Sequence, residues 1–344
     1  MIDVGIIGAT GYAGVELIRI LHGHPQVHIQ ALGSVSFEGQ EIDDIYPSLA
    51  GICPQKLLTT DEVIDACEVV FASVPHGVSE EIGRKCVDQD KLLIDLGADF
   101  RLCDPEDYKE WYKLDYKDPE LHKLAVYSIP ELHREKVKGA KIIGNPGCYP
   151  TSIALGLFPA LKAGIIDPDT IVIDSKSGVT GAGRGLSQTS HYPDCNEAFS
   201  PYKIASHRHT PEIEQTISQI VGRDVYVTFV PHLLPLNRGI VSTIYAKMKT
   251  PLSPKELHEL YAHTYQGETF VRVMKEGAVA NLKNVRGSNY CDISVHADPR
   301  TGRLIIVSTI DNMVKGAAGQ AIQNMNLALG LPEDMGLHMA PLCF

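Results

Sequence analysis

The sequence lacks the features that mark membrane-spanning, secreted and repetitive chains. It has no apolar run of about 18 residues, the length that a helix needs to cross a bilayer. Its N-terminus, MIDVGIIGATGYAG, lacks the basic start and the longer apolar stretch of a signal peptide. It also has no internal repeat and no low-complexity segment. We therefore expect a globular, cytoplasmic protein without a membrane span.

Basic residues are in the minority: there are 31 Lys and Arg against 42 Asp and Glu, so the net charge is -11. An acidic surface argues against nucleic acid or an anionic membrane as the main partner. A small anionic ligand would then need a local cluster of Arg, Lys and backbone N–H groups.

Paired cysteines are also missing. The chain has neither a C-x-x-C pair nor a Cys/His spacing of the zinc type, so we expect no metal site. In a chain without a signal peptide, scattered cysteines are typical of reduced thiols that fill the core. The eight cysteines are Cys53, Cys67, Cys86, Cys103, Cys148, Cys195, Cys291 and Cys343.

The 344 residues are enough for two domains, and the pattern of elements changes near residue 150. Before it, short apolar runs at 3–9, 27–34, 68–77, 91–99 and 140–147 alternate with helical segments, which predicts βαβ units and a parallel sheet. After it, we expect a helix over 152–164 interrupted at Pro159, strands at 170–178 and within 225–249, and a hairpin over 292–311. The last segment, 312–331, predicts an amphipathic helix.

These elements predict an α/β protein with a Rossmann-type parallel-sheet domain and a mixed α+β catalytic and dimerisation domain inserted before a C-terminal helix. We expect the nucleotide-binding domain to comprise residues 1–147 and 312–344. The catalytic and oligomerisation domain should then span 148–311. The flat mixed sheet expected in this second domain favours a homodimer or homotetramer.

The stretch GATGYAG follows the first predicted strand and opens the first predicted helix. It spaces Gly8, Gly11 and Gly14 three residues apart, with Thr10 and Tyr12 between them. Glycines at this point let the backbone approach a pyrophosphate, and the helix N-terminus supplies N–H groups. We predict a dinucleotide site here, and the alternative is a glycine-rich turn without a ligand.

The end of the second predicted strand bears on the choice of cofactor. NAD sites usually carry a carboxylate there to bind the ribose hydroxyls. This chain has Ser34 and Ser36 instead, with no acid before Glu38 and no Arg at this point. A 2′-phosphate would meet no repulsion, so we favour NADPH over NADH.

The stretch GNPGCYPT places Cys148 between Pro146 and Pro150 at a strand-to-helix corner. Pro150 suits the first turn of a helix, so the thiol should lie at a helix N-terminus. The dipole and N–H groups there lower a thiol pKa and can bind an oxyanion. We predict that Cys148 is a nucleophile, whereas the alternative is one more buried structural thiol.

The stretch ASHRHTPEIEQ supplies candidates for a base and for substrate contacts. His207, Arg208, His209 and Glu212 lie within six positions that lead into a helix. One histidine could act as the base while the other, or Arg208, binds an anion. The alternative is a solvated helix start capped by Thr210. Further candidate anion contacts in turn-rich stretches are Arg101, Arg184 and Arg286.

A dinucleotide site, a reactive thiol, a histidine and arginines together fit the interconversion of an acyl phosphate and an aldehyde through a thioester. With these features the sequence resembles the N-acetyl-γ-glutamyl-phosphate reductases, which belong to the aspartate-semialdehyde-dehydrogenase-like group. The stretches that carry the resemblance span nearly the whole chain in the family's order. They are GATGYAGVEL, SVPHGVS, DLGADFRL, GNPGCYPT, KSGVTGAGR, HRHTPEI and VKGAAGQAIQNMN.

The resemblance implies reduction of N-acetyl-γ-glutamyl phosphate with NADPH in arginine biosynthesis. It implies Cys148 as the nucleophile, His207 as the base and His209 as a substrate contact. It also implies that Asn312 and Gly316 lie near the nicotinamide. Three alternatives remain open: aspartate-semialdehyde dehydrogenase, an acylating aldehyde dehydrogenase that uses coenzyme A, and a non-catalytic NADP-binding regulator.

Overall fold

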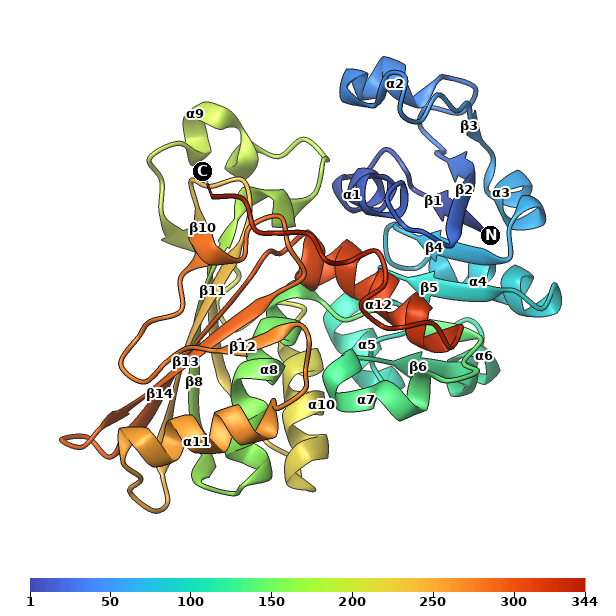
Figure 1. Cartoon of the computed structure of the whole chain (residues 1–344). Helices are drawn as coiled ribbons and strands as arrows, with labels where there is room; N and C mark the ends of the chain where they lie inside the picture. The colour runs from blue at the N-terminus through green and yellow to red at the C-terminus, as the bar shows by residue number, and fades with distance from the viewer. Residues whose placement is uncertain (344) are drawn as a thin grey trace. The chain divides into compact units, whose positions relative to one another are not determined.

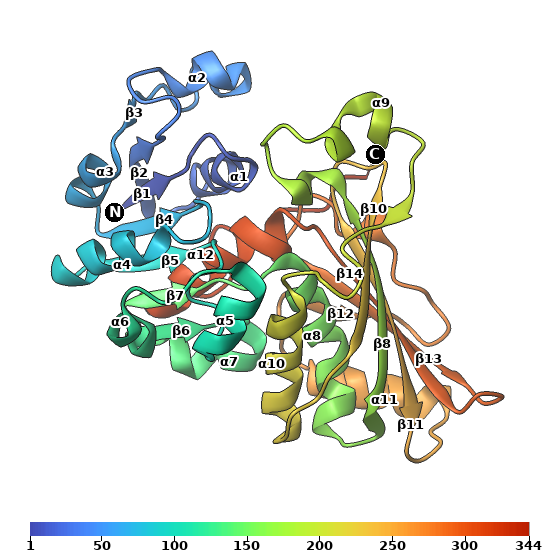
Figure 2. The same cartoon turned by 180° about the vertical axis from the view of Figure 1, so that it is seen from behind.

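The computed structural model describes residues 1–343 and divides into two compact units. One unit comprises Met1–Pro146 with Ala317–His338, and the other comprises Gly147–Gly316 with the tail from Met339 onward. Figures 1 and 2 show the elements of each unit from opposite sides. Each unit is built on its own seven-stranded sheet, and the fold class expected from the sequence is confirmed.

The first unit contains a sheet of order β3-β2-β1-β4-β5-β7-β6 in which every pair of neighbours is parallel. Its core strands are almost fully buried, as expected when helices cover both faces. The strands are β1 (Ile2–Ile7), β2 (Val27–Gly33), β3 (Leu57–Leu58), β4 (Val69–Ala72), β5 (Leu92–Asp95), β6 (Ala125–Tyr127) and β7 (Ile142–Gly144).

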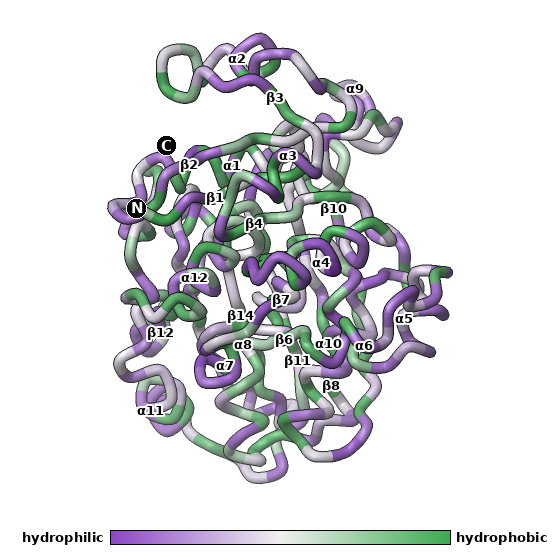
Figure 3. Tube along the Cα trace, turned by 90° about the vertical axis from the view of Figure 1, so that its right-hand side faces the viewer, coloured by the Kyte–Doolittle hydropathy of each residue, from purple (hydrophilic) through white to green (hydrophobic). Residues whose placement is uncertain are grey.

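Helices α3, α4 and α6 pack on one face of this sheet, and α1, α7 and α12 belong to the other (Figure 1). The charged outer helices α4 and α7 are drawn mainly in the hydrophilic colour in Figure 3. The helices of this unit are α1 (Tyr12–Leu21), α2 (Ile42–Ile45), α3 (Thr60–Ala66), α4 (Ser79–Asp88), α5 (Pro105–Tyr112), α6 (Pro119–Leu124), α7 (Pro130–Val137) and α12 (Gly319–Ala328).

The second unit contains a mixed sheet of order β12-β13-β14-β11-β8-β10-β9. Strands β8, β11, β14 and β13 are antiparallel neighbours, whereas β10 runs parallel to β8. The strands are β8 (Ile166–Gly178), β9 (Ser200–Pro201), β10 (Thr228–Leu234), β11 (Ile240–Met248), β12 (Val271–Val273), β13 (Cys291–Asp298) and β14 (Arg303–Ile310). The predicted hairpin is confirmed as β13 and β14.

Helices α8 (Cys148–Lys162) and α11 (Pro254–Thr264) pack on one face of this sheet, and α10 (Thr210–Val221) packs against α8. The short helix α9 (Tyr192–Cys195) lies in the loop after β8. Along β11, residues facing α8 are buried, while the alternate residues Val241, Thr243 and Tyr245 stay partly exposed. Figure 2 shows this other face without a helix from the described part of the second unit.

Two predictions about helices were wrong. The helix after Cys148 is not interrupted, because α8 continues through Pro159. Proline cannot donate to the carbonyl of Leu155, and the hydroxyl of Tyr265 donates to that oxygen instead. A neighbouring tyrosine, Tyr261, donates to the carbonyl of Gly156 at 2.9 Å. Tyr261 of α11 and Tyr265, the residue after it, thus satisfy two carbonyl groups of α8 near the proline.

The C-terminal segment differs from the expected amphipathic helix. It begins with a π-helical turn, Val314–Ala318, and only then forms α12. Every residue from Gly319 to Leu327 is buried, so the helix has no polar outer face. Its amides are used inside the protein instead: Asn326, for example, donates to the carbonyls of Glu333 and Met335. The polar residues of this segment therefore form buried hydrogen bonds rather than a face exposed to solvent.

Candidate active site

The glycine loop joins β1 to α1 and requires glycine at two of its three positions. Gly8 has φ of +82°, and a Cβ there would lie 2.2 Å from the carbonyl oxygen of Ser73. A Cβ at Gly14 would lie 2.2 Å from the carbonyl oxygen of Gly8. Gly11 is the N-cap of α1. The loop therefore turns tightly onto a helix N-terminus, which is the geometry that binds a pyrophosphate.

The other residues predicted to hold the cofactor differ in exposure. The hydroxyls of Thr10 and Ser34 are buried and lie 3.0 Å apart, which ties the glycine loop to the end of β2. Tyr46 donates to the carbonyl of Thr10 at 2.9 Å. Tyr12 and Ser36 are exposed. The residues present fit a dinucleotide whose ribose end meets hydroxyls and no carboxylate.

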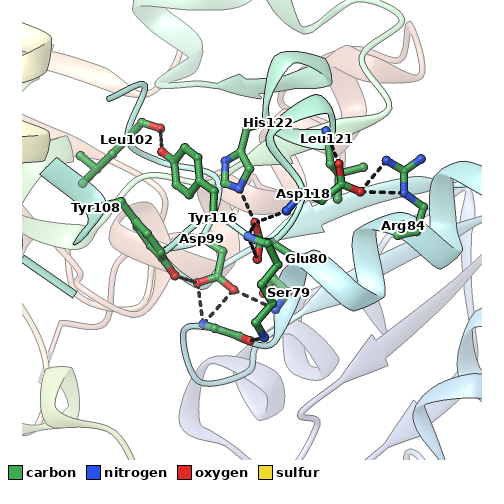
Figure 4. A network of polar contacts seen from close by, with 12 residues as sticks. Ser79, Glu80, Arg84, Asp99, Leu102, Tyr108, Tyr116, Asp118, Leu121 and His122 are labelled. Atoms are coloured by element: carbon green, nitrogen blue, oxygen red, sulfur yellow. Dashed lines mark hydrogen bonds and ion pairs between the residues drawn. The ribbon is translucent and has the colours of Figure 1, made fainter. Parts of the chain in front are cut away.

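Two loops at the carboxyl ends of β4 and β5 are fixed by buried carboxylates (Figure 4). The carboxylate of Asp99 accepts hydrogen bonds from the amides of Gly77 and Ser79 and from the hydroxyl of Tyr108. The carboxylate of Glu80 lies 2.6 Å from the imidazole of His122. These bonds hold the SVPHGVS and DLGADFRL stretches as rigid parts of the first unit.

A third carboxylate, Asp95 at the end of β5, is fully buried in the same cluster. Its Oδ1 accepts from the hydroxyl of Ser79 at 2.7 Å and from the amide of Gly97 at 2.9 Å. Burial and the nearby Asp99 raise the pKa of Asp95 to about 6. The carboxylates of this cluster are therefore buried beneath the loops and are not exposed to a ligand.

Arg101, predicted as a substrate contact, is 8 % exposed. Its Nε donates to the carbonyl of Asn145 at 2.9 Å, and its Nη2 donates to the carbonyl of Leu96 at 2.8 Å. These bonds anchor the guanidinium to the main chain at the ends of β5 and β7. The predicted contact with substrate stays a prediction.

In the second unit, Cys148 is the first residue of α8 and Gly147 is its N-cap. Pro150 has no N–H, and the amide of Thr151 donates to the carbonyl of Gly147 at 3.0 Å. The amides at the start of the helix are therefore those of Cys148 and Tyr149. The thiol is partly exposed, and its position is the one that the prolines of the sequence predict.

Glu212 is another predicted substrate contact, and that contact stays a prediction. It is fully buried, and its Oε1 accepts from the amide of Gly147 at 2.8 Å. Because Glu212 lies in the first turn of α10, this bond joins the N-termini of α8 and α10. Its contacts are those of a residue that positions the start of α8.

Gly316, predicted to lie near the cofactor, lies against the thiol residue. A Cβ at this position would be 2.7 Å from the Cβ of Cys148. The π-helical turn that carries it is held by Asp311, whose Oδ1 accepts from the amide of Met313 and whose carbonyl accepts from the amide of Gly316. Only a glycine lets this segment approach the thiol so closely.

Asn312 is buried and bonded within the second unit. Its Oδ1 accepts from the amide of Gly239 at 2.6 Å, and its Nδ2 donates to the hydroxyl of Thr180 at 3.0 Å. Its predicted contact with a nicotinamide stays a prediction. Arg184 lies in an exposed loop near Thr180, and Arg208 is half-buried beside His207.

The two histidines of the HRH motif have different surroundings. His207 is buried among Tyr149, Tyr202 and Phe229. Its Nδ1 accepts from the amide of His209 at 3.1 Å, so the neutral ring carries its proton on Nε2. Burial, aided by Lys203 and Arg208, lowers the pKa of His207 to about 3. His209 is the N-cap of α10 and is only half-buried.

A chain of hydroxyl groups leads away from His207, and the sequence did not predict it. The Nε2 of His207 lies 3.2 Å from the hydroxyl of Tyr202, which donates to the hydroxyl of Tyr149 at 3.3 Å. Tyr149 in turn donates to the carbonyl of His232. Burial and the nearby Cys148 raise the pKa of Tyr202 to about 12. The one available signal was the tyrosine that follows Cys148 in the motif.

The thiols in the core of the first unit lie in surroundings that suppress reactivity. Burial raises the pKa of Cys67 to about 11 and that of Cys86 to about 12. Within residues 1–343, no group of three or more His, Cys, Asp or Glu side chains could hold a metal ion. Nor does any helix of the described chain have the length and apolar character needed to cross a membrane.

Two family models match the chain and together cover most of it. The model described as "Semialdehyde dehydrogenase, NAD binding domain" matches residues 3–140, and "Semialdehyde dehydrogenase, dimerisation domain" matches residues 148–312. Curated relatives match over their whole length. Proteins named N-acetyl-gamma-glutamyl-phosphate reductase are 59% identical in Brachyspira hyodysenteriae, 52% in Clostridium botulinum and 50% in Moorella thermoacetica, and each alignment covers 100% of both chains.

Solved structures share the fold at low sequence identity. Aspartate semialdehyde dehydrogenase II from Vibrio cholerae superimposes with a TM-score of 0.73 at 14% identity, covering 95% of this chain and 98% of that one. The aspartate semialdehyde dehydrogenase of Candida albicans, solved with NADP, has a TM-score of 0.68 at 17% identity, with the same coverage of both chains. These likenesses establish the architecture.

Proposed function

We propose that this chain, which belongs to the semialdehyde dehydrogenase family and within it to the N-acetyl-γ-glutamyl-phosphate reductases, reduces N-acetyl-γ-glutamyl phosphate to N-acetyl-L-glutamate 5-semialdehyde and phosphate. Family membership rests on the two models and on the full-length relatives. The observation that carries the reaction is Cys148 at the N-terminus of α8, seated against Gly316. We place the reaction in arginine biosynthesis in the cytoplasm.

The chemistry begins with the thiolate of Cys148, which attacks the acyl carbon and expels phosphate to leave a thioester. The amides at the start of α8 stabilise negative charge on the carbonyl oxygen. NADPH, when bound by the glycine loop, supplies the hydride that reduces this thioester. Collapse of the resulting hemithioacetal breaks the C–S bond, and the aldehyde leaves with regeneration of the thiolate.

The surroundings of the histidines favour His209 as the acid–base group for the hemithioacetal oxygen. His207 is a weak base because burial keeps it neutral, and both its ring nitrogens have partners. His209 lies at the start of α10, which the Glu212–Gly147 bond joins to the start of α8. We therefore assign His207 to positioning His209 and Tyr202, whereas the sequence led us to expect His207 as the base and His209 as a substrate contact.

Anionic groups of the substrate would need basic side chains to bind them. Arg208 follows His207 directly, and Arg184 lies in the glycine-rich loop after β8. We propose these two as substrate contacts, with Arg101 as a third whose guanidinium is already oriented by two carbonyls. A bidentate guanidinium suits both carboxylate and phosphate.

Replacing Gly316 with alanine should lower kcat by roughly 10²-fold, because a misplacement of about 1 Å at a reacting group can have that effect. The added Cβ would lie 2.7 Å from the Cβ of Cys148. Steady-state kinetics measure the change. Gly23→Ala is the control, since its Cβ would meet only the carbonyl of Ile20 at 3.7 Å. A wild-type kcat in Gly316→Ala would show that catalysis does not depend on the close contact between residue 316 and Cys148.

The match to a dimerisation domain and the uncovered sheet face support a homodimer. The alternate residues of β11 on that face are the partly exposed Val241, Thr243 and Tyr245 and the exposed Lys247. This mixture of apolar and polar groups suits burial against a second copy. We propose that two chains pair through it. A light-scattering mass of two chains is expected; one chain would contradict the proposal, and four would show that dimers associate further.

The test of the function is an assay with purified protein, N-acetyl-γ-glutamyl phosphate, and NADPH or NADH. We expect turnover with NADPH to exceed that with NADH, since Ser34 rather than a carboxylate follows β2. In the oxidative direction the reaction should require phosphate. Turnover of β-aspartyl phosphate in preference would identify an aspartate-semialdehyde dehydrogenase. Dependence on coenzyme A would identify an acylating aldehyde dehydrogenase.

A further inference from the structure

Asn145 lies three residues before Cys148 in the GNPGCYPT stretch and is 1 % exposed. All four of its polar groups are engaged within the first unit. Its amide donates to the carbonyl of Asp95 at 2.8 Å, and its carbonyl accepts from Nε of Arg101 at 2.9 Å. Its main chain is therefore fixed on both sides at the end of β7.

The side chain of Asn145 links two distant parts of the sequence. Its Nδ2 donates to the carbonyl of Ala317 at 3.2 Å, and its Oδ1 accepts from Nδ2 of Asn324 at 3.1 Å. Asn324 also donates to the carbonyl of Ser128 at 3.0 Å, which orients its amide. The side chain of Asn145 thus holds the segment that leads into α12.

Ala317 follows Gly316, the residue that lies against Cys148. A short closed path results: the chain from Asn145 to Cys148, the contact of Cys148 with Gly316, the peptide bond to Ala317, and the hydrogen bond back to Asn145. Loss of the Asn145 side chain would open this path at one point. The two segments that lead to the thiol would then lose the side-chain bonds of Asn145 that hold them together.

We infer that Asn145 is a positioning residue for the nucleophile. It acts on Cys148 through the main chain that precedes the thiol residue and through the Gly316–Ala317 segment that lies against it. The inference rests on the proposed function of Cys148 but concerns a residue that does not itself react. A hydrogen-bonded clamp of this kind fixes where the thiol lies and leaves substrate affinity unchanged. Its loss should therefore slow the chemistry rather than weaken binding.

The test compares Asn145→Ala with Asn326→Ala in the full-length protein. Asn326 lies on the same helix as Asn324, is buried, and makes two carbonyl bonds and a contact with His24. Both variants should lower the melting temperature. Only Asn145→Ala should lower kcat, by roughly tenfold or more, with KM for either substrate within about threefold of wild type.

Alkylation of Cys148 by iodoacetamide is the second readout, measured per site by mass spectrometry with exposed Cys103 as the internal reference. The rate ratio of Cys148 to Cys103 should fall in Asn145→Ala and stay at the wild-type value in Asn326→Ala. If the wild-type protein does not reduce the acyl phosphate, the proposed function fails. The alkylation ratio still decides the role of Asn145 in that case. Equal ratios and equal kcat in the two variants would overturn the inference.

Asn145→Asp covers the case in which the alanine variant does not fold. This substitution keeps the size and the Oδ1 acceptor but removes the Nδ2 donor to Ala317. It should reproduce the fall in kcat and in the Cys148 alkylation ratio. Wild-type values for both in Asn145→Asp would likewise overturn the inference.

Discussion

Replacing Cys148 with serine should abolish reduction of N-acetyl-γ-glutamyl phosphate, with a loss of about 10⁴-fold or more, as for other catalytic nucleophiles. A serine hydroxyl at this position would be un-ionised, because a hydroxyl resists deprotonation far more than a thiol does. An oxygen ester would also accept hydride less readily than a thioester. NADPH consumption by purified Cys148→Ser measures the loss.

Binding of NADPH should survive in Cys148→Ser, because the glycine loop belongs to the first unit and does not include the thiol. Fluorescence titration with NADPH checks this point. Cys103→Ser is the control for thiol replacement in general, since Cys103 is exposed and makes no part of the site. Full turnover by Cys148→Ser would contradict the thioester route and favour a non-catalytic role for the thiol stretch.

Iodoacetamide should modify Cys148 before the core thiols. Burial raises the pKa of Cys67 to about 11 and that of Cys86 to about 12, so neither forms thiolate near neutral pH. Cys148, in contrast, is partly exposed and is the first residue of α8, the kind of position at which reactive thiols occur. Prior addition of the acyl phosphate should protect it. Equal modification of all eight thiols would indicate that the helix start does not activate Cys148.

Local sequence signals predicted the parallel sheet, the glycine loop and the place of Cys148. Each of these depends on short-range rules: a glycine that must adopt positive φ at Gly8, a proline in the first turn at Pro150, and apolar runs for buried strands. Such rules act within a few residues of the chain. They therefore remain visible without any tertiary structure.

Features that depend on distant partners were not visible in the sequence. Pro159 did not end α8, because Tyr265, at the end of α11 and distant in the sequence, supplies the missing donor. Glu212 looked like a polar helix start but is buried against Gly147. The side-chain amides of α12 suggested the polar side of an amphipathic helix, but they form hydrogen bonds inside the first unit. In each case the sequence shows the type of residue but not the distant residue that forms a hydrogen bond with it.

His209→Ala should lower kcat by about 10²- to 10⁴-fold, the usual contribution of a general acid or base. Loss of His207 should have a smaller effect, because its ring supports the His209 amide through Nδ1 and the Tyr202 hydroxyl through Nε2. Replacing the exposed His191 serves as the control for loss of an imidazole. Steady-state kinetics of the three variants rank their effects.

The pH profile separates the two histidines independently of these variants. Burial lowers the pKa of His207 to about 3, so a base at that position would lose activity only as the pH falls toward 3. An acidic limb of kcat/KM well above pH 3 would therefore exclude His207 as the titrating base. A limb near pH 3, together with a larger loss in His207→Ala than in His209→Ala, would return the acid–base role to His207. Both results are needed, since loss of a buried ring can also disturb its neighbours.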